Sequence, residues 1–218
     1  YKIMIDHHPQ PEEVFDLMLS DVQASSTAEL VYEFIAAMGG EGIMNRAAAE
    51  CLFAGIITDT GSFSYSNNNP RTYEIASRLV ALGVDATMVN QAVYNTYSEH
   101  RLRLLGYCLG EKMKVFPRHH AAYISLTAEE LKRFKHTEGD TEGVVNYPLS
   151  IKNINLSAIF IERQNHIKIS FRSAGDLDVN LLAREHFQGG GHKNAAGGKY
   201  YDTMENTLLK FEDLLKRY

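Results

Sequence analysis

The sequence predicts an α/β protein of two domains, with a strand followed by helices in the first half and strands followed by helices in the second half. An apolar run with strand character, residues 1–5, opens the chain and is followed by segments of helical periodicity. Past residue 118 the pattern changes, and apolar strand-like runs dominate. The length of 218 residues suits two modest domains, and 44% hydrophobic with 22% charged residues is ordinary for a folded protein.

The first half is predicted as a strand followed by helices. Hydroxyl side chains precede residues 28–35 and two glycines follow them, as at the two ends of a helix. Residues 52–57 are interpreted as a helix or as another buried apolar segment, because periodicity does not separate the two in a short run. The predicted helices cover residues 12–19, 28–35, 45–51, 71–82 and parts of 88–109, with a loop at 67–70.

The second half is predicted as strands with helices after them. The strands cover residues 121–126, 156–161 and 167–172, with a hairpin turn at Asn165-His166, and the helices cover 179–187 and 204–217. Gly106, Gly110 and Pro117 mark the change from one domain to the next. We expect a first domain at 1–98, a linker helix at 99–117 and a second domain at 118–218.

Composition narrows the class of protein. A net charge of −5 excludes a global basic field that would hold long duplexes. Cys51 and Cys108 lack a CxxC spacing, which indicates reduced core thiols in a cytoplasmic protein. No apolar run reaches the ~18 residues of a membrane span, and no leader pattern is present, so we expect no membrane partner. Residue 1 is Tyr within a strand pattern, so we expect the natural protein to begin upstream.

Metal-binding side chains follow two apolar segments. Asp6-His7-His8 comes directly after the first strand, and Asp59 follows residues 54–57 in a turn with Gly61. Imidazole and carboxylate are good ligands for Mn²⁺, Fe²⁺ or Zn²⁺, and open α/β folds place ligands at the carboxyl ends of their strands. Alone, the triplet is also typical of a polar turn ahead of Pro9. Two apolar segments that both end on ligand chemistry favour a shared site.

A glycine-rich segment, residues 189–198, carries His192 at its centre. One glycine is enough to end a helix, and further glycines let backbone N–H groups approach phosphate oxygens. A flexible loop is the alternative interpretation. Arg172 and Ser173, at the end of a predicted strand, offer a phosphate fork and a hydroxyl, although a strand-end arginine is also often a solvated charge.

On these residues, the chain resembles the DHH/DHHA1 phosphoesterase family, in particular its small oligoribonucleases (nanoRNases) that also dephosphorylate 3′-phosphoadenosine 5′-phosphate. Asp6-His7-His8 matches the third family motif and residues 58–61 match the fourth. Residues 171–173 with 189–198 match the DHHA1 domain, and the resemblance covers essentially the whole chain. It implies a remnant of a Rossmann-like, parallel-sheet DHH domain, a smaller mixed-sheet DHHA1 domain and a cleft between them.

The resemblance also implies roles. His7 and Asp59 would bind Mn²⁺, one of two ions in the complete site or another divalent metal in its place. His8 would face the scissile phosphate, and Asp6 would be a carboxylate near the metal. The substrate would be a short RNA or a small phosphorylated nucleotide, and a homodimer is common in the family. The residues expected to hold the substrate are Arg172, Ser173, Gly190, Gly191 and His192.

Two departures qualify the resemblance. The first and second family motifs, which supply further metal-binding carboxylates, are absent, so we expect this chain alone to be inactive. Gln188 stands where relatives often carry a fourth glycine. Within the enzyme class, a cyclic dinucleotide phosphodiesterase is the alternative, while a pyrophosphatase or exopolyphosphatase would have a different second domain. Outside the enzyme class, the alternative is a nucleotide-binding module with an incomplete metal site.

Overall fold

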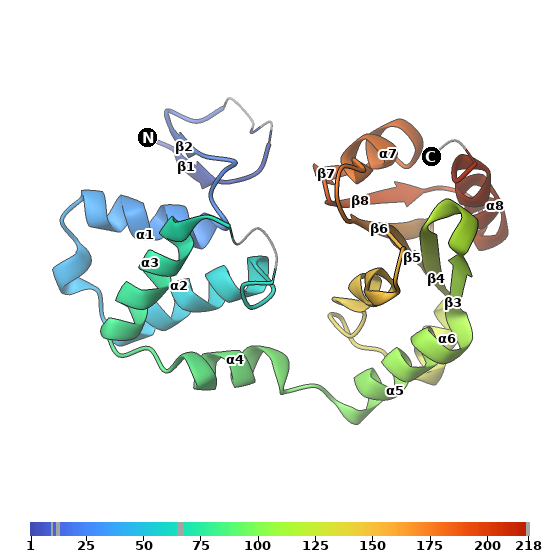
Figure 1. Cartoon of the computed structure of the whole chain (residues 1–218), viewed down its shortest axis with the longest axis horizontal. Helices are drawn as coiled ribbons and strands as arrows, with labels where there is room; N and C mark the ends of the chain where they lie inside the picture. The colour runs from blue at the N-terminus through green and yellow to red at the C-terminus, as the bar shows by residue number, and fades with distance from the viewer. Residues whose placement is uncertain (10, 12–13, 65–67, 217–218) are drawn as a thin grey trace. The chain divides into compact units, whose positions relative to one another are not determined.

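The structure is a computed structural model that describes residues 1–9, 11, 14–64 and 68–216. The chain divides into two compact units, Tyr1–Thr96 and Tyr97–Tyr218, referred to below as unit 1 and unit 2. Unit 1 contains a parallel two-stranded sheet, and unit 2 contains a mixed sheet of six strands (Figure 1). The prediction of an α/β fold with a parallel sheet followed by a mixed sheet is confirmed.

The sheet of unit 1 consists of β1 (Ile3–Asp6) and β2 (Leu17–Ser20), and Asp6 is in register with Ser20. The carboxyl ends of both strands therefore lie at one edge. The prediction of a helix over residues 12–19 is wrong where the structure describes that segment, because residues 17–19 pair with β1. A short apolar run fits a helix or a strand equally well, and here the pairing decides. Residues 12 and 13 lie outside the described part.

Four α-helices complete the described part of unit 1: α1 (Thr27–Ala37), α2 (Arg46–Asp59), α3 (Pro70–Ala81) and α4 (Ala86–Tyr94). A 3₁₀ turn, η1 (Glu41–Ile43), lies between α1 and α2. Every N-cap is a short polar side chain that accepts a backbone N–H, namely Ser26, Asn45, Asn69 and Asp85. The helices share an apolar core, and residues 52–57 are helical. Asn67 of the predicted loop is not among the described residues.

Close packing of α1 on α2 depends on Gly55. A Cβ atom at this position would lie 2.6 Å from the Cβ of Ala28 in α1. The missing side chain lets the two helices approach, and Ile56 and Ile57 beside it are buried in the core. The C-terminal end of α2, where Asp59 lies, is therefore fixed against α1.

Unit 2 begins with α5 (Glu99–Tyr107), which has Ser98 as its N-cap and continues as a π-helical turn, η2 (Cys108–Lys112). The sheet order is β3-β4-β5-β6-β8-β7, and β4 and β5 are its parallel pair. The strands are β3 (Met113–Phe116), β4 (Ala121–Leu126), β5 (Leu156–Glu162), β6 (Ile167–Ser173), β7 (Gly190–His192) and β8 (Ala195–Tyr200). The remaining helices are α6 (Ala128–Arg133), α7 (Val179–His186), α8 (Met204–Leu214) and the 3₁₀ turns η3 (Pro117–His119) and η4 (Val144–Ser150).

The three strands predicted for the second half are confirmed as β4, β5 and β6, and β5 and β6 are antiparallel around the predicted hairpin turn. The helices predicted at 179–187 and 204–217 correspond to α7 and α8, although residue 217 lies outside the described part. The sequence did not indicate β3, β7 or β8. The last two carry the glycine-rich segment, which forms a β-hairpin.

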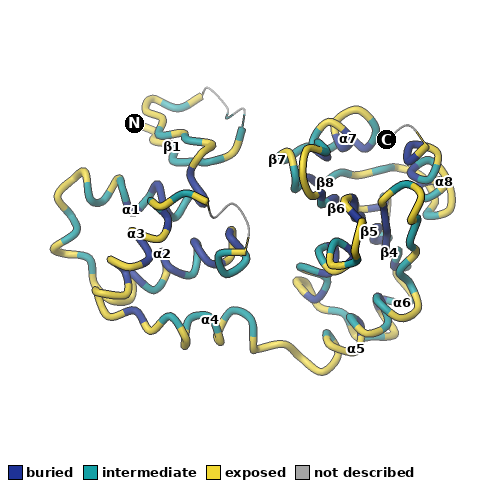
Figure 2. Tube along the Cα trace, viewed as in Figure 1, coloured by how far each residue is buried: buried dark blue, intermediate teal, exposed yellow. Residues whose placement is uncertain are grey.

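Strands β4 and β5 of unit 2 are buried on both faces, whereas β6 alternates buried and more exposed residues (Figure 2). Alternate residues of β5 contribute to two apolar clusters: Phe160 packs with Phe171 and Phe211, while Ile159 packs with Leu104 and Leu131. Helices α7 and α8 contribute to the first cluster, and α5 and α6 to the second. This arrangement explains why β5 reads as a continuous apolar run.

The two cysteines differ. Cys108 is completely buried, as predicted, whereas Cys51 on α2 is exposed, so the prediction that both are core residues is wrong for Cys51. Across residues 1–9, 11, 14–64 and 68–216, none of the helices combines the length and apolarity that a membrane crossing requires.

Candidate metal centre and glycine hairpin

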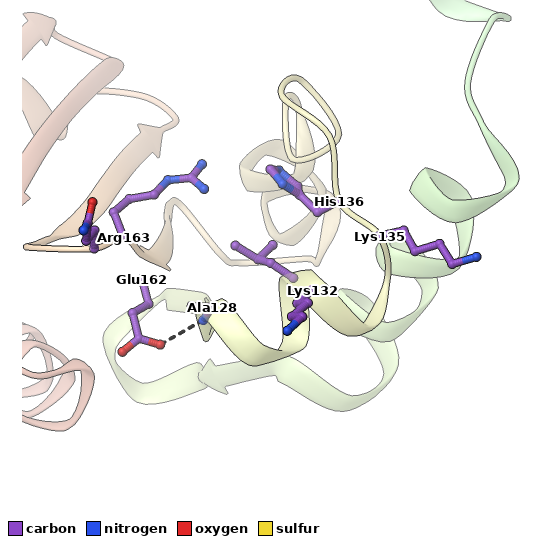
Figure 3. A pocket seen from close by; sticks show the side chains of 8 residues that line it. Ala128, Lys132, Lys135, His136, Glu162 and Arg163 are labelled. Atoms are coloured by element: carbon purple, nitrogen blue, oxygen red, sulfur yellow. Dashed lines mark hydrogen bonds between the residues drawn. The ribbon is translucent and has the colours of Figure 1, made fainter.

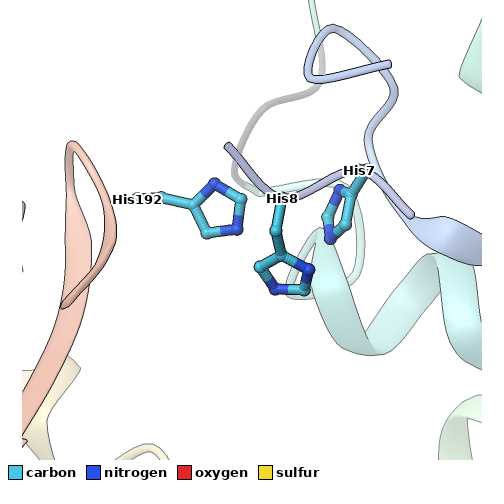
Figure 4. A group of neighbouring side chains, drawn as sticks. All are labelled: His7, His8 and His192. Carbon is cyan, nitrogen blue, oxygen red and sulfur yellow. The ribbon is translucent and has the colours of Figure 1, made fainter. Parts of the chain in front are cut away.

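The triplet predicted to bind metal lies at the carboxyl end of β1. Asp6 is the last residue of the strand, and His7 and His8 follow it directly (Figure 4). The imidazole rings of His7 and His8 lie with their centroids 4.7 Å apart, edge to face. A strand that ends on three polar side chains thus presents two imidazoles beside each other at one edge of the unit 1 sheet.

The orientation of His7 is fixed by a backbone carbonyl. Its Nδ1 lies 3.2 Å from the oxygen of Ala24, and a carbonyl only accepts, so Nδ1 carries the proton. In the neutral form of this tautomer the lone pair is on Nε2, which lies 3.6 Å from Oδ2 of Asp59. The His7 side chain is only 12% exposed. This is the arrangement found for metal-binding histidines, whose second nitrogen donates to a carbonyl or carboxylate.

Asp59 is brought to His7 by the C-terminal end of α2. We predicted an apolar segment that ends in a polar turn, and the segment is a helix rather than a strand. The turn after it is held by Thr60, whose hydroxyl donates to the carbonyl of Ile56 and accepts the N–H of Phe63. The carboxylate and the negative end of the helix dipole both favour a cation at this position.

Asp6 orients the second histidine. Its Oδ1 accepts from Nδ1 of His8 at 2.7 Å and from the backbone N–H of His7 at 2.9 Å. Burial raises the pKa of Asp6, but the hydrogen bonds and charge of His8 and the N–H of His7 outweigh it, and the net pKa lies below its ordinary value. Asp6 is therefore ionised near neutral pH. The side chain of His8 is more than half exposed, which leaves it accessible to a substrate.

A buried polar network supports the segment that carries Ala24. Glu29 of α1 is fully buried, and its Oε2 accepts from the hydroxyls of Ser25 at 2.6 Å and Thr72 at 2.7 Å. Arg71, at the start of α3, places Nε 3.3 Å from Oε1 of Glu29 and binds Asp21 at 3.1 Å. Arg71 also pairs with Glu33.

Sequence reasoning missed this network. The run Ser25-Ser26-Thr27 was interpreted only as a helix start, and nothing in the sequence linked Arg71 to the triplet. An acidic residue two positions after a run of hydroxyls is a weak signal that could have indicated it.

The donor set of unit 1 fits a divalent transition metal. His7 offers an imidazole nitrogen and Asp59 a carboxylate oxygen, a combination that Mn²⁺, Fe²⁺ and Zn²⁺ accept. The two donor atoms are close enough to reach one ion, because each metal bond of this kind is roughly 2 Å long. The structure thus brings together the two residues predicted to bind metal, and their role stays a prediction.

In unit 2, the glycine-rich segment forms the hairpin of β7 and β8, so the alternative of a flexible loop is wrong. A Cβ atom on Gly189 would lie 1.9 Å from the carbonyl oxygen of Gly197, and one on Gly198 would lie 2.5 Å from the oxygen of Phe187. Gly191 has φ +149° and is equally crowded. Close approach of backbones therefore requires these glycines.

Gly190 is different. A Cβ atom there would make only ordinary contacts, at 3.6 Å from Arg184 and Asn180, and its φ is not positive. Among the described residues of unit 2, no packing requires a glycine at this position.

Several predicted substrate donors have partners inside the protein. The N–H of Gly191 donates to Oδ1 of Asn180 at 2.9 Å. The hydroxyl of Ser173, a buried residue, donates to the carbonyl of Leu177 at 2.7 Å and accepts from Asn194 at 2.9 Å. These bonds indicate that Ser173 and Gly191 shape the hairpin and the turn beside it.

Arg172 and His192 lie in one row of the sheet. Both are in register with Ala195 of β8, Arg172 from β6 and His192 from β7. Residues directly opposite each other in antiparallel strands point to the same face. Arg172 and His192 therefore flank Ala195 on one face, while Phe171 points to the buried core on the other. Nη1 of Arg172 donates to the carbonyl of Phe171 at 2.9 Å.

Comparison with known proteins gives three likenesses. The DHHA1 domain family matches residues 120–218. A probable bifunctional oligoribonuclease and PAP phosphatase NrnA from Streptococcus mutans is 33% identical over 99% of this chain and 68% of the relative. The cyclic-di-AMP phosphodiesterase GdpP from Bacillus subtilis is 32% identical over 99% of this chain and 32% of the relative.

A crystal structure of an exopolyphosphatase-related protein from Bacteroides fragilis superposes with a TM-score of 0.93 at 48% identity. The match covers 99% of this chain and 63% of that one. This chain thus spans about two thirds of the length of the Bacteroides protein and of the Streptococcus relative.

Proposed function

The chain belongs to the DHH/DHHA1 phosphoesterase family. We therefore propose that it functions in a metal-dependent phosphoesterase, which hydrolyses short oligoribonucleotides, 3′-phosphoadenosine 5′-phosphate or both. The observation that carries the proposal is the distance of 3.6 Å between Nε2 of His7 and Oδ2 of Asp59, with the His7 proton held on the opposite nitrogen. An imidazole and a carboxylate at this distance supply the two donor types that a divalent transition metal takes.

In this proposal, unit 1 holds the metal. His7 and Asp59 bind a divalent ion, with Mn²⁺ as the expected species, and when bound the metal supplies Lewis acidity and activation of water. His8 faces the scissile phosphate and stabilises the charge that develops there, with Asp6 holding its ring through Nδ1.

Unit 2 holds the substrate. Arg172 and His192, on one face of the sheet, are proposed to bind the terminal phosphate, and the missing side chain of Gly190 lets that phosphate approach the backbone. Ser173 and Gly191, which bond within the protein, are proposed to keep this surface in shape. The cytoplasm is the proposed compartment.

The charge distribution supports this division of labour. Unit 1 contains four Lys and Arg residues against 12 Asp and Glu residues, whereas unit 2 contains 18 against 15. An acidic unit favours cations, and a unit with a small positive excess favours a phosphorylated ligand. The excess is too small to hold long nucleic acid without sequence preference, which agrees with short substrates.

A cyclic dinucleotide phosphodiesterase is the second candidate, favoured by the 32% identity to GdpP over nearly the whole chain. The name of the Bacteroides protein also makes a phosphoanhydride a compound to test, and pyrophosphate represents this class in the experiment below.

The deciding experiment compares hydrolysis of four compounds by the full-length protein with Mn²⁺: a linear diribonucleotide, 3′-phosphoadenosine 5′-phosphate, a cyclic dinucleotide and pyrophosphate. We expect turnover of the first two, and preference for the cyclic compound would support the second candidate. Asp59→Ala should reduce activity by roughly a hundredfold or more. Glu50→Gln, which changes a carboxylate elsewhere on α2, is the matched control and should retain activity.

Full activity of Asp59→Ala would refute the metal assignment. Absence of all four activities, with nucleotide binding retained, would favour a non-enzymatic binding module.

A further inference from the structure

An open pocket of about 440 Å³ lies in unit 2 between α6 and the turn that joins β5 to β6 (Figure 3). Its lining is unusually rich in charge. It includes Lys132, Lys135, His136, Glu162 and Arg163.

Among the residues that the structure describes, the cations of this pocket form no ion pair. Lysines 112, 114, 193 and 216 each pair with a carboxylate. Within the described part of the chain, no carboxylate pairs with Lys132, Lys135 or Arg163. The one carboxylate in the lining, Glu162, accepts the backbone N–H of Ala128 at 2.8 Å. Lys132, Arg163 and one engaged carboxylate therefore line the pocket, while the Lys135 side chain extends away from them (Figure 3).

His136 adds an unused polar atom. Its Nε2 is buried and has no hydrogen-bond partner among the residues that the structure describes. Figure 3 shows the side chain of Arg163 extending toward His136. Burial first, and then the charge of Arg163, lower the pKa of His136, with Asp140 acting in the opposite direction. A buried nitrogen without a hydrogen-bond partner is costly.

The pocket is separate from the row formed by Arg172 and His192. In the β5–β6 register, Arg172 pairs with Ser157 near one end of β5, whereas Glu162 is the last residue at the other end. Five residues of strand span about 17 Å. A phosphate bound by Arg172 therefore cannot also occupy this pocket.

We propose that the pocket binds a phosphate monoester, as carried by a free nucleotide or by the phosphorylated end of a short RNA. Arg163 and Lys132 neutralise the dianion beside the ring of His136. The two cationic groups of Arg163 and Lys132 complement a dianion better than the single charge of a phosphodiester. This inference goes beyond the proposed function and does not depend on it.

The test follows the His136 ring signals by NMR during titration of the full chain without divalent metal. Inorganic phosphate, adenosine 5′-monophosphate and a 5′-phosphorylated diribonucleotide are the probes, and an unphosphorylated diribonucleotide, which has only a diester, is the control. Loss of a signal in His136→Gln assigns the ring. We expect the three monoester-type probes to shift it. If only the mononucleotide among the organic probes shifts the signal, the ligand is a free nucleotide. If both organic probes shift it, phosphorylated RNA ends bind as well.

Arg163→Gln should weaken binding of the mononucleotide by about tenfold, because it removes a charge-assisted hydrogen bond. Arg118→Gln, at an exposed position elsewhere in unit 2, is the matched control and should bind normally. The proposal is wrong if none of the monoester probes shifts His136, if the unphosphorylated dinucleotide binds equally well, or if Arg163→Gln keeps full affinity. This experiment measures binding and not hydrolysis. A negative result therefore does not bear on the metal-centre proposal, which the Asp59→Ala variant tests.

Discussion

Nε of Arg71 lies 3.3 Å from Oε1 of Glu29, a carboxylate with no exposed surface. Arg71 also binds Asp21, at the start of the segment that leads to Ala24, and the carbonyl of Ala24 fixes the proton of His7. A residue 64 positions after His7 in the sequence thus helps to hold the metal-binding ring in place. Positioning groups of this kind commonly alter metal affinity when they are removed.

Arg71→Met should therefore destabilise the protein by about 3 kcal/mol, because it removes the guanidinium that lies beside the buried Glu29 carboxyl group and pairs with Asp21 and Glu33. It should also weaken Mn²⁺ binding by roughly 10- to 100-fold although both ligands remain. Urea denaturation and Mn²⁺ titration by electron paramagnetic resonance measure the two effects. Arg78→Met, which removes an exposed arginine of the same helix, should change neither appreciably. Normal Mn²⁺ affinity in a folded Arg71→Met protein would show that the network is purely structural.

Glu130 provides a pH-dependent contribution to the stability of unit 2. Burial raises its pKa, but Lys112, the backbone N–H of Thr127 and Tyr107 together lower it to about 2 from the ordinary value of 4.5. The folded state thus favours the charged form. The stabilisation is complete above pH 4.5 and is lost as the pH falls from 4.5 to about 2.

We expect Glu130→Gln to lower the free energy of unfolding by about 3 kcal/mol at pH 7, and by progressively less below pH 4.5. Urea denaturation at several pH values measures this difference. Glu129→Gln, on the exposed side of the same helix, should show little effect at any pH. A destabilisation by Glu130→Gln that is equal at pH 7 and pH 3 would contradict the assignment.

The glycines of the hairpin should separate into structural and ligand-facing positions. Gly189→Ala should destabilise the protein by roughly 1–3 kcal/mol, because the added Cβ would overlap the backbone at Gly197. Gly190→Ala has room for its methyl group and should leave the melting temperature nearly unchanged, but raise KM for short RNA in the full-length protein. Unchanged kinetics for Gly190→Ala would remove this residue from the proposed phosphate site.

The two thiols should differ in reactivity. Burial, followed by the nearby charge of Glu130, raises the pKa of Cys108 to about 12, whereas Cys51 is exposed. A thiol reagent at pH 8 should therefore modify Cys51 rapidly and Cys108 only after denaturation. Mass spectrometry of the labelled protein identifies the modified site, and Cys51→Ser should abolish labelling of the native chain. Fast labelling of native Cys51→Ser would show that Cys108 is accessible.

Local sequence signals predicted most of the helices and the central strands. The four caps of unit 1 are short polar residues ahead of helical patterns, and the continuous apolar run of β5 reflects burial on both faces. The strand β2 was missed because Leu17–Ser20 acquires its identity only by pairing with β1. The hairpin of β7 and β8 was missed because its glycines permit close backbone contact, a property of the folded chain and not of the local pattern.

The candidate metal centre was predictable only in part. His7 and Asp59 stood out because ligand-type side chains follow apolar segments, and the structure places them together. The carbonyl of Ala24 carries no side-chain signal, since every residue has one. Arg71 belongs to a helix start without an evident link to the triplet, and Glu29 was hidden within a helical pattern.

Anomalous diffraction from crystals of the full-length protein grown with Mn²⁺ tests the central claim most directly. The account predicts a manganese peak with coordination bonds to Nε2 of His7 and a carboxylate oxygen of Asp59, and loss of that peak in Asp59→Asn. A manganese ion bound elsewhere, with His7 and Asp59 both outside its coordination shell, would contradict it.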